Sequence, residues 1–356
     1  MEEGGTKLFA AAGTPRGPEA RKEDAAFYNP AMRPNRDLSL LVVDAYARQR
    51  GRPIDVADVL AGTGARSLRL AGLDADVTVH ANDADPKAAE AMVKGREANG
   101  IDADRLRIHH DDAHRFLARQ RFDVVDVDPF GSPAPFLDAA LRATRHNGLL
   151  CLTATDTAAL CGTVPRVCRR RYGAEHRLHK APWRAEVGLR ILAGTAIRAA
   201  GRFDRAATPI LSVFGGHWLR VILRIQDGKQ RSDQNQAMLS GAVMDAGGLG
   251  RFARPGDASP LWTGPLHESA FMSYVARCDG IDEASWSLFQ TLRAEADAPA
   301  FWAELGALRR ELGTDAPKRD ALRAKLVETG FQAAPTHMDP QGIRTDADLA
   351  AIRTVW

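Results

Sequence analysis

The feature that most constrains the fold is a regular alternation of strand-like and helix-like segments between residues 54 and 153. Short apolar runs recur there, and each leads into a stretch with helical spacing. Residues 122–127 are mostly apolar, which suits a strand buried on both faces of a sheet. This alternation predicts a parallel sheet with helices on both faces, and therefore an α/β fold. The expected strands are Ile54–Leu60, Val77–Ala81, Leu106–His110, Phe122–Val127 and Leu149–Thr153.

Two further strand-like runs follow, Pro209–Phe214 and Trp218–Ile225, with only Gly215-Gly216-His217 between them. So short a connection cannot hold a crossover helix, so this pair is expected to be antiparallel. A parallel sheet that ends in an antiparallel hairpin is typical of class I methyltransferases rather than of NAD-binding Rossmann domains, by analogy of fold.

Composition excludes several classes of protein. No apolar run approaches the roughly 18 residues that a membrane-spanning helix needs. Met1–Ala12 has two early acids and no long apolar core, so a secretory signal is not expected. Cysteine is rare and forms neither a CxxC pair nor the spacing of a disulfide scaffold. We therefore expect a reduced, cytoplasmic protein without membrane segments.

The length of 356 residues favours two domains. Residues 227–259 are polar and rich in glycine, which indicates a linker or a domain boundary. Helical spacing returns over Ala284–Ala294, Phe301–Leu312 and Lys318–Thr329. We expect one domain over residues 1–227 and a small, mainly helical α+β domain over 228–356.

Three successive strands end in residues that suit a nucleotide-like cofactor. Gly62 and Gly64 follow the first strand, where glycines let the backbone approach a ligand. Asp83 ends the second strand, where an acid accepts hydrogen bonds from two ribose hydroxyls. The third strand ends in Asp111-Asp112-Ala113, which suits an adenine amino group. Helix capping by ordinary loop aspartates explains each acid singly, but not the series.

The fourth strand ends in Asp126-Val-Asp128-Pro129-Phe130, at the edge where open α/β sheets bind ligands. Asp128-Pro129-Phe130 resembles the Asn/Asp-Pro-Pro-Tyr/Phe motif of amino-group methyltransferases. A base-conjugated amine is a poor nucleophile, so a carboxylate that accepts its hydrogens would direct its lone pair and take its proton. The neighbouring aromatic ring would stack the base. The alternative is a Pro-containing turn after a buried strand.

Two other segments suggest substrate contacts. Phe27-Tyr28-Asn29-Pro30 places two aromatic rings before a turn, although, for this segment taken alone, a hydrophobic staple for the next helix is the preferred explanation. Residues 160–205 carry eleven Lys or Arg against three acids, starting with the run that contains Arg169 and Arg170. Such a run is typical either of a solvated helical face or of a surface that follows RNA phosphates.

Taken together, these segments resemble the tRNA (guanine-N(2))-dimethyltransferase family, which acts on the guanine at tRNA position 26. The resemblance also includes a Glu-x-Gly-x-Arg-Ile-Leu segment from Glu186 and the Gly342-Ile-Arg344-Thr345 segment. The matching segments are Phe27–Asp37, Val59–Arg66, Ala81–Asp83, His110–Ala113, Asp126–Pro133, Leu152–Gly162, Glu186–Leu192, Pro260–Leu266, Thr336–His337 and Gly342–Thr345.

The resemblance implies an enzyme that transfers one or two methyl groups from S-adenosylmethionine to the N(2) amine of that guanine. Residues 1–227 would be the methyltransferase domain, with an N-terminal substrate segment, and 228–356 the tRNA-docking domain. The catalytic residues would be Asp128, Pro129 and Phe130, with Asp128 as the acceptor of the amine proton. Phe130 and Phe27 would sandwich the guanine. The implied cofactor residues are Arg36, Gly62, Gly64, Arg66, Asp83, Asp111, Asp112 and Ala113, and the implied substrate residues are Phe27, Asn29, Phe130, Arg169, Arg170 and Arg344.

The chain departs from the family pattern at two places. Some members carry four zinc-binding cysteines in the second domain, whereas this chain has only Cys278 there, and one thiol cannot complete a tetrahedral site. We therefore expect no metal. Ala185 stands where the family usually has His. Methylation of a different guanine or adenine amine, and a non-catalytic RNA-binding relic, remain as alternatives. The sequence leaves open the number of methyl groups, the tRNAs accepted and the oligomeric state.

Overall fold

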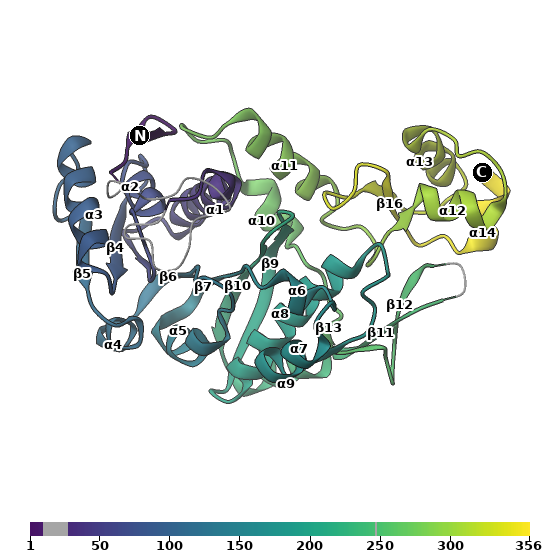
Figure 1. The fold of residues 1–356 in the computed structure, drawn as a ribbon, viewed down its shortest axis with the longest axis horizontal. Helices are drawn as coiled ribbons and strands as arrows, with labels where there is room; N and C mark the ends of the chain where they lie inside the picture. The colour runs from purple at the N-terminus through teal and green to yellow at the C-terminus, as the bar shows by residue number, and fades with distance from the viewer. Residues whose placement is uncertain (10–27, 246–247) are drawn as a thin grey trace. The chain divides into compact units, whose positions relative to one another are not determined.

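The computed structural model describes residues 1–9, 28–245 and 248–356 (Figure 1). The chain forms two compact units, which are described separately below. Each unit consists of three separate chain segments, whereas the two domains expected from the sequence are continuous. Unit 1 comprises Met1–Ala154, Ile222–Gly228 and Tyr274–Ser287, and unit 2 comprises Thr155–Val221, Lys229–Ser273 and Leu288–Trp356.

The largest sheet has seven strands in the order β5-β4-β3-β6-β7-β10-β9. The pairs β4/β5, β3/β4, β3/β6 and β6/β7 are parallel, as the alternation in the sequence predicts. Only residues 215–218 connect β9 to β10, so these two strands form an antiparallel hairpin. The strands are β3 (Ile54–Asp58), β4 (Val77–Asp83), β5 (Leu106–His110), β6 (Phe122–Val127), β7 (Thr144–Ala154), β9 (Arg205–Phe214) and β10 (Leu219–Asp227).

Helices join the parallel strands of unit 1. Helix α1 contacts α2, α2 contacts α3, and α4 contacts α5. In Figure 1 these two groups lie on opposite sides of β6 and β7, which confirms the α/β fold class. The helical elements are η1 (Pro30–Met32), α1 (Arg33–Arg50), α2 (Ala65–Ala71), α3 (Pro86–Ala98), α4 (Ala113–Arg119), η2 (Ala134–Phe136) and α5 (Leu137–Ala143).

The segment Ala134–Arg145 has helical spacing, but only part of it is α-helical in the structure. It begins as a 3₁₀ turn, and its α-helical part ends at Ala143. Thr144 instead begins β7 and pairs with Phe122 of β6. Strand pairing therefore overrides helical spacing for the last residues of this segment.

A small hairpin that was not expected from the sequence precedes the sheet in the chain. Strand β1 (Glu2–Glu3) pairs antiparallel with β2 (Thr6–Lys7). The turn consists of Gly4 and Gly5, at φ values of 57° and 81°. Both values lie in the left-handed region, which glycine adopts without the steric cost that other residues meet.

Unit 2 contains a four-stranded sheet in the order β12-β11-β13-β8, in which all pairs are antiparallel. Most of it comes from residues 227–259, so the expected linker is wrong. Glycines and polar residues suggested a loop, but Ala242 and Ala258 pair across two strands of this sheet and are buried. The elements are β8 (Glu175–His176), α9 (Lys229–Ala237), β11 (Leu239–Met244), β12 (Gly250–Ala253) and β13 (Ala258–Trp262).

The remaining elements are mainly helical. The carboxy-terminal part builds its own apolar core around Leu305, Leu322, Ile343 and Ile352, with a three-stranded sheet in the order β14-β16-β15. No helix within the described residues is both long and apolar enough to cross a bilayer. The elements are α6 (Thr157–Leu160), α7 (Pro165–Tyr172), α8 (Arg184–Gly201), α10 (Ser269–Tyr274), α11 (Glu283–Ala294), β14 (Ala303–Glu304), α12 (Leu305–Leu312), α13 (Arg319–Glu328), β15 (Ala333–Pro335), β16 (Gly342–Thr345) and α14 (Leu349–Val355).

His176 of β8 is buried in unit 2 as a neutral ring. Its Nδ1 accepts a hydrogen bond from the backbone N–H of Leu178 (3.2 Å), and its Nε2 bonds to the carbonyl oxygen of Arg184 (3.2 Å). Burial lowers the pKa of His176 to about 4. Between its ordinary pKa of 6.5 and about pH 4, this histidine binds a proton in the unfolded chain but stays neutral in the folded chain.

We therefore expect the free energy of unfolding to decrease as pH falls from 6.5 to 4, by roughly 3 kcal/mol in total. Urea unfolding of wild type and of His176→Gln, at a series of pH values, measures this dependence. The variant is expected to be less stable at pH 7 but to lose less stability on acidification. The same replacement of the exposed His217 is the control. Equal pH slopes for wild type and His176→Gln would contradict the prediction.

Candidate active site

The carboxyl ends of four neighbouring strands of unit 1 bring acidic side chains to one edge of the sheet. Register places Asp58 of β3 opposite Asp126 of β6. Asp83 lies opposite His110, at the ends of β4 and β5. Asp128 follows two residues after Asp126. The edge predicted from the sequence therefore carries the carboxylates expected there.

A single guanidinium, that of Arg66 in α2, bridges these carboxylates. Its Nη1 lies 3.0 Å from Asp126 Oδ1 and 3.6 Å from Asp58 Oδ1. Its Nη2 donates to Asp128 Oδ2 and, over 2.8 Å, to Asn35 Oδ1. The side chain of Arg66 is only 6% exposed, whereas that of Asp128 is 16% exposed. Asp128 is thus the more accessible carboxylate of a cluster that is otherwise sealed.

Charge balance in this cluster favours the ionised guanidinium. Burial alone would lower the pKa of Arg66, but Asp126, Asp128 and Asp58 outweigh that effect and raise it. Burial and the two neighbouring carboxylates raise the pKa of Asp58 to about 6, although Arg66 opposes them. Three acids around one cation therefore make a site that disfavours further negative charge.

The turn between β3 and α2 depends on two glycines and on Asp83. Gly62 and Gly64 have φ values of 55° and 73°, in the left-handed region. The backbone N–H of Gly62 donates to Asp83 Oδ2 over 2.8 Å, and that of Asp85 donates to Oδ1 over 2.9 Å. Each carboxylate oxygen of Asp83 thus accepts one bond and keeps further acceptor capacity.

Gly64 also lies close to Met92 of α3. A Cβ added at Gly64 would stand 2.6 Å from Met92 Cγ. We expect Gly64→Ala to lower the free energy of unfolding by about 1–3 kcal/mol more than Gly100→Ala. Gly100 is the matched control, because it has a similar φ of 63° but open space around it. Denaturant unfolding of both variants measures the difference, and equal losses would mean that φ alone matters.

Asp111 and Asp112 serve local structure. Asp112 Oδ1 accepts from the backbone N–H groups of His114 (3.0 Å) and Arg115 (3.2 Å), so it caps α4. These bonds, led by that of Arg115, lower the pKa of Asp112. The carboxylate of Asp111 pairs with Arg115 and Arg119. Ala113 begins the helix and is buried. Capping, the alternative weighed for these acids, is thus present in the structure, and their cofactor contacts stay a prediction.

The expected substrate residues of unit 1 lie in two places. Phe130, after Pro129, is 48% exposed, which is unusual for a large aromatic side chain. Asn29 caps η1 by accepting from the backbone N–H of Ala31 (2.9 Å). Phe27 lies outside the described residues. Sandwiching of a base between Phe130 and Phe27 therefore remains a prediction.

Arg36 of α1 is held by a residue that the sequence analysis missed. Its Nε donates to Glu3 Oε1 over 2.8 Å, its Nη2 donates to Glu3 Oε2, and Nη2 also reaches the carbonyl oxygen of Asn29 at 3.1 Å. Glu3 precedes the glycines of the β1–β2 turn, and that Gly-Gly pair was the available signal for a hairpin.

The expected RNA-contacting arginines of unit 2 differ in their surroundings. On α7, Arg169 pairs with Glu175, and Arg170 is exposed. Arg344 is buried, and its Nη1 and Nε lie 2.8 Å from Glu186 and Glu295. Arg344 thus joins two buried carboxylates, and its RNA contact stays a prediction.

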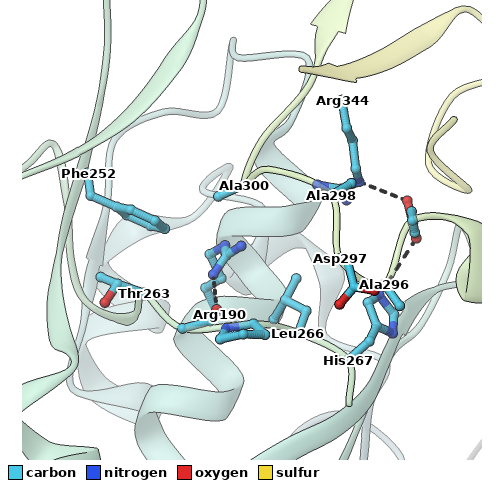
Figure 2. A pocket seen from close by; sticks show the side chains of 13 residues that line it. Arg190, Phe252, Thr263, Leu266, His267, Ala296, Asp297, Ala298, Ala300 and Arg344 are labelled. Atoms are coloured by element: carbon cyan, nitrogen blue, oxygen red, sulfur yellow. Dashed lines mark hydrogen bonds and ion pairs between the residues drawn. The ribbon is translucent and has the colours of Figure 1, made fainter. Parts of the chain in front are cut away.

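Arg344 also lines a small cleft of unit 2, of about 310 Å³, together with Arg190, Phe252 and His267 (Figure 2). Arg190 is also paired with a buried carboxylate, because its Nε and Nη2 donate to Glu186 Oε1 (2.9 and 2.8 Å). The charges around this cleft are therefore already paired with one another.

The residues at the sheet edge of unit 1 fit a nucleoside cofactor better than a metal ion. Asp83 keeps acceptor capacity for ribose hydroxyls, beside a glycine turn. The acids at the ends of β3 and β6 are occupied by Arg66. Among residues 1–9, 28–245 and 248–356, no group of three or more His, Cys, Asp or Glu side chains is arranged to hold a metal.

Comparisons with known proteins agree with this geometry. The family model for N2,N2-dimethylguanosine tRNA methyltransferase matches residues 12–247 and 251–356. A tRNA (guanine(26)-N(2))-dimethyltransferase of Thermococcus kodakarensis is 34% identical, with 92% of each chain covered. One of Pyrobaculum arsenaticum is 36% identical, with 92% of this chain and 90% of that protein covered.

A solved structure, Trm1 from Pyrococcus horikoshii with S-adenosyl-L-methionine, has 29% identity and a TM-score of 0.87. The match covers 100% of this chain and 98% of that one. The chain belongs to the N2,N2-dimethylguanosine tRNA methyltransferase family.

Proposed function

We propose that this protein transfers methyl groups from S-adenosylmethionine to the exocyclic N(2) amine of guanine at position 26 of tRNA. The observation that carries the proposal is the placement of Asp128 at the end of β6. Its carboxylate is partly exposed and held by Arg66, and Phe130, two residues later, is half exposed. Membership of the family supports the same reaction.

Unit 1 supplies the groups for binding the donor. When bound, S-adenosylmethionine supplies an electrophilic methyl group on a positively charged sulfur. Asp83 would accept hydrogen bonds from the ribose hydroxyls, next to the turn of Gly62 and Gly64. The Asp111-Asp112-Ala113 segment would contact the adenine. Arg36 and Arg66 would donate to the acidic end of the cofactor. The positions of Asp83 at the end of β4 and of Asp111 directly after β5 support the assignment of the ribose and adenine contacts.

The guanine amine needs help because its lone pair is delocalised into the ring. The carboxylate of Asp128 would accept a hydrogen bond from the amine and so direct the nitrogen lone pair. It would take the amine proton as the new N–C bond forms and the bond between the methyl group and the sulfonium sulfur breaks, which leaves a neutral thioether. Arg66, which is itself held by Asn35, fixes the direction of that carboxylate. Phe130 would stack on the base and keep water away, with Phe27 on the other side.

The test is mass-spectrometric mapping of unmodified tRNA after incubation with the protein and S-adenosylmethionine. A gain of one or two methyl groups on guanine 26 is the expected result. Methylation of another guanine or of an adenine would keep the chemistry and change the substrate. Binding of both cofactor and tRNA without any methylation would indicate a non-catalytic RNA-binding protein instead.

Helix α7 is the proposed surface for tRNA phosphates. Arg166 and Arg170 are exposed, and their spacing of four residues places them on one face of the helix. We expect Arg166→Ala/Arg170→Ala to weaken tRNA binding and to reduce the slope of log K against log [salt] by roughly 1 to 2. Arg121→Ala is the control, because Arg121 is exposed at the amino end of β6, away from the catalytic edge. Filter binding at several salt concentrations measures both slopes, and equal slopes would argue against this surface.

We further place the protein in the cytoplasm and propose that it works without a metal. No disulfide links the four cysteines, all of which lie in the described residues, and Cys151, Cys161 and Cys168 are buried. Burial raises the pKa of Cys161 to about 11, so this thiol stays protonated and unreactive at neutral pH. These properties suit small apolar residues of a reduced protein.

A further inference from the structure

The amino-terminal hairpin brings a carboxylate to Arg36, one of the expected cofactor residues. Glu3 is 3% exposed, although it lies in a strand of only two residues. Its Oε1 accepts from Arg36 Nε (2.8 Å) and Arg69 Nη1 (2.6 Å), and its Oε2 accepts from the Tyr28 hydroxyl (2.9 Å) and Arg36 Nη2. These bonds satisfy the acceptor capacity of an ionised carboxylate. Glu3 thus has no capacity for a further ligand and acts only through its partners.

The carboxylate of Glu3 stays ionised through the pH range of any assay. Burial would raise its pKa, but the hydrogen bonds and charges of Arg36 and Arg69 outweigh burial and lower the pKa to about 2. Removing one partner of a buried charge pair is costly, because the other charge then stays buried without its partner. Neutralising Glu3 would therefore change the conformation or the hydration of its partners.

The backbone around Glu3 is fixed by close packing. A Cβ at Gly4 would stand 2.7 Å from the carbonyl oxygen of Gly280 and 3.0 Å from Arg69 Nη2, so only glycine allows this approach. Beyond the turn, Lys7 and Asn99 exchange two hydrogen bonds, of 2.9 and 2.8 Å. The hairpin is therefore docked on both sides of Glu3, and the position of its carboxylate is set by the fold.

Two of the groups that Glu3 holds belong to segments with expected roles in methyl transfer. Arg36, an expected cofactor residue, is gripped through Nε and Nη2, which fixes the plane of its guanidinium. Its Nη1 has no hydrogen-bond partner among the described residues. Tyr28 begins the part of the substrate segment that the structure describes, and its ring lies 5.1 Å from the Arg36 guanidinium.

The third group, Arg69, connects Glu3 to the catalytic side of the sheet. Arg69 follows Arg66 by one turn of α2. Its Nη2 pairs with Asp37 of α1, while Arg66 pairs with Asp128. Helices α1 and α2 are thus joined through Glu3 and by the Arg69–Asp37 pair, and again where Arg66, the partner of Asp128, donates to Asn35.

We propose that Glu3 is a positioning residue of this site, which orients Arg36 for the cofactor and Tyr28 for the substrate segment. This role rests on the proposed function, because it assumes that Arg36 contacts S-adenosylmethionine. The hairpin would then form one wall of the site, with Glu3 behind the contacting residues.

The experiment measures equilibrium binding of S-adenosylmethionine to the purified full-length protein by isothermal titration calorimetry, which needs no tRNA. Glu3→Gln keeps the size of the side chain and removes the charge, and we expect the Kd to rise about 10- to 100-fold. Glu2→Gln, the exposed neighbour on the same strand, is the matched control and should leave the Kd unchanged. Tyr28→Phe removes only the hydroxyl bond and should raise the KM for tRNA while the Kd for the cofactor stays near wild type.

A double-mutant cycle separates positioning from loss of fold. If Glu3 acts through Arg36, then Glu3→Gln adds little to the loss of affinity already caused by Arg36→Lys. Fully additive losses, or a normal Kd for Glu3→Gln, would overturn the proposal. A wild-type protein that does not bind S-adenosylmethionine would overturn the proposed function itself, before any variant is compared.

Discussion

Replacing Asp128 with alanine is expected to lower the rate of methyl transfer by about 10²- to 10⁴-fold, because the amine loses the group that accepts its proton. Binding of S-adenosylmethionine should stay near wild type, because Asp128 is not itself an expected cofactor residue. Arg66, which is one, is still held by Asn35, Asp58 and Asp126. The fold should also survive. Arg66 keeps Asp126 at 3.0 Å and Asp58 at 3.6 Å, so no buried cation is left alone.

Asp128→Asn is the matched control for shape. The amide keeps one oxygen for the amine hydrogen but cannot take a proton, so we expect nearly the same loss of rate as in Asp128→Ala. Single-turnover methylation of tRNA, with cofactor affinity measured separately, tests both variants. Unchanged turnover in Asp128→Ala would remove this carboxylate from the mechanism, and recovery of most activity in Asp128→Asn would limit its role to orientation.

The largest effect on stability is expected at Arg344 in unit 2. This guanidinium joins Glu186 and Glu295, both buried, with 2.8 Å to each. Burial alone would raise the pKa of Glu295, but the charges of His337 and Arg344 outweigh it and lower the pKa. Arg344→Ala leaves two buried carboxylates with fewer cations, so we expect a loss of roughly 3–5 kcal/mol in the free energy of unfolding.

Arg309→Ala is the control for that variant. Arg309 pairs with Asp315 over 2.8 Å, but both side chains are exposed, and surface ion pairs contribute at most about 1 kcal/mol. Urea unfolding at pH 7 compares the two variants. An Arg344→Ala protein that is as stable as wild type but binds tRNA poorly would support the RNA contact implied by the family, against the structural role described here.

The sheet and the candidate site were predictable because their signals are local. A strand that is buried on both faces, such as Phe122–Val127, depends on a few adjacent residues. The same holds for a turn with glycines at positive φ, such as that of Gly62 and Gly64. In the sequence, the carboxylates directly follow or end successive strands. Parallel pairing then brings Asp58 opposite Asp126 without further information.

The missed features depend on contacts between residues far apart in the chain. Nothing near Glu3 in the sequence indicates that Arg36 and Arg69 will surround it. The sheet built from residues 227–259 was missed for a related reason. Its strands are short and rich in glycine and polar residues, and pairing between them, rather than their composition, buries Ala242 and Ala258.

Helix α2 has only seven residues, and all of them are buried. A helix this short is not stable on its own in water, so its ion pairs and packing must supply the stability. Arg66 needs the ends of β3 and β6, and Arg69 needs the amino-terminal hairpin and α1. The helix can therefore complete its contacts only after all of these parts have assembled. During folding, the candidate cofactor side and the catalytic side of the site would thus become ordered together, as one cooperative step.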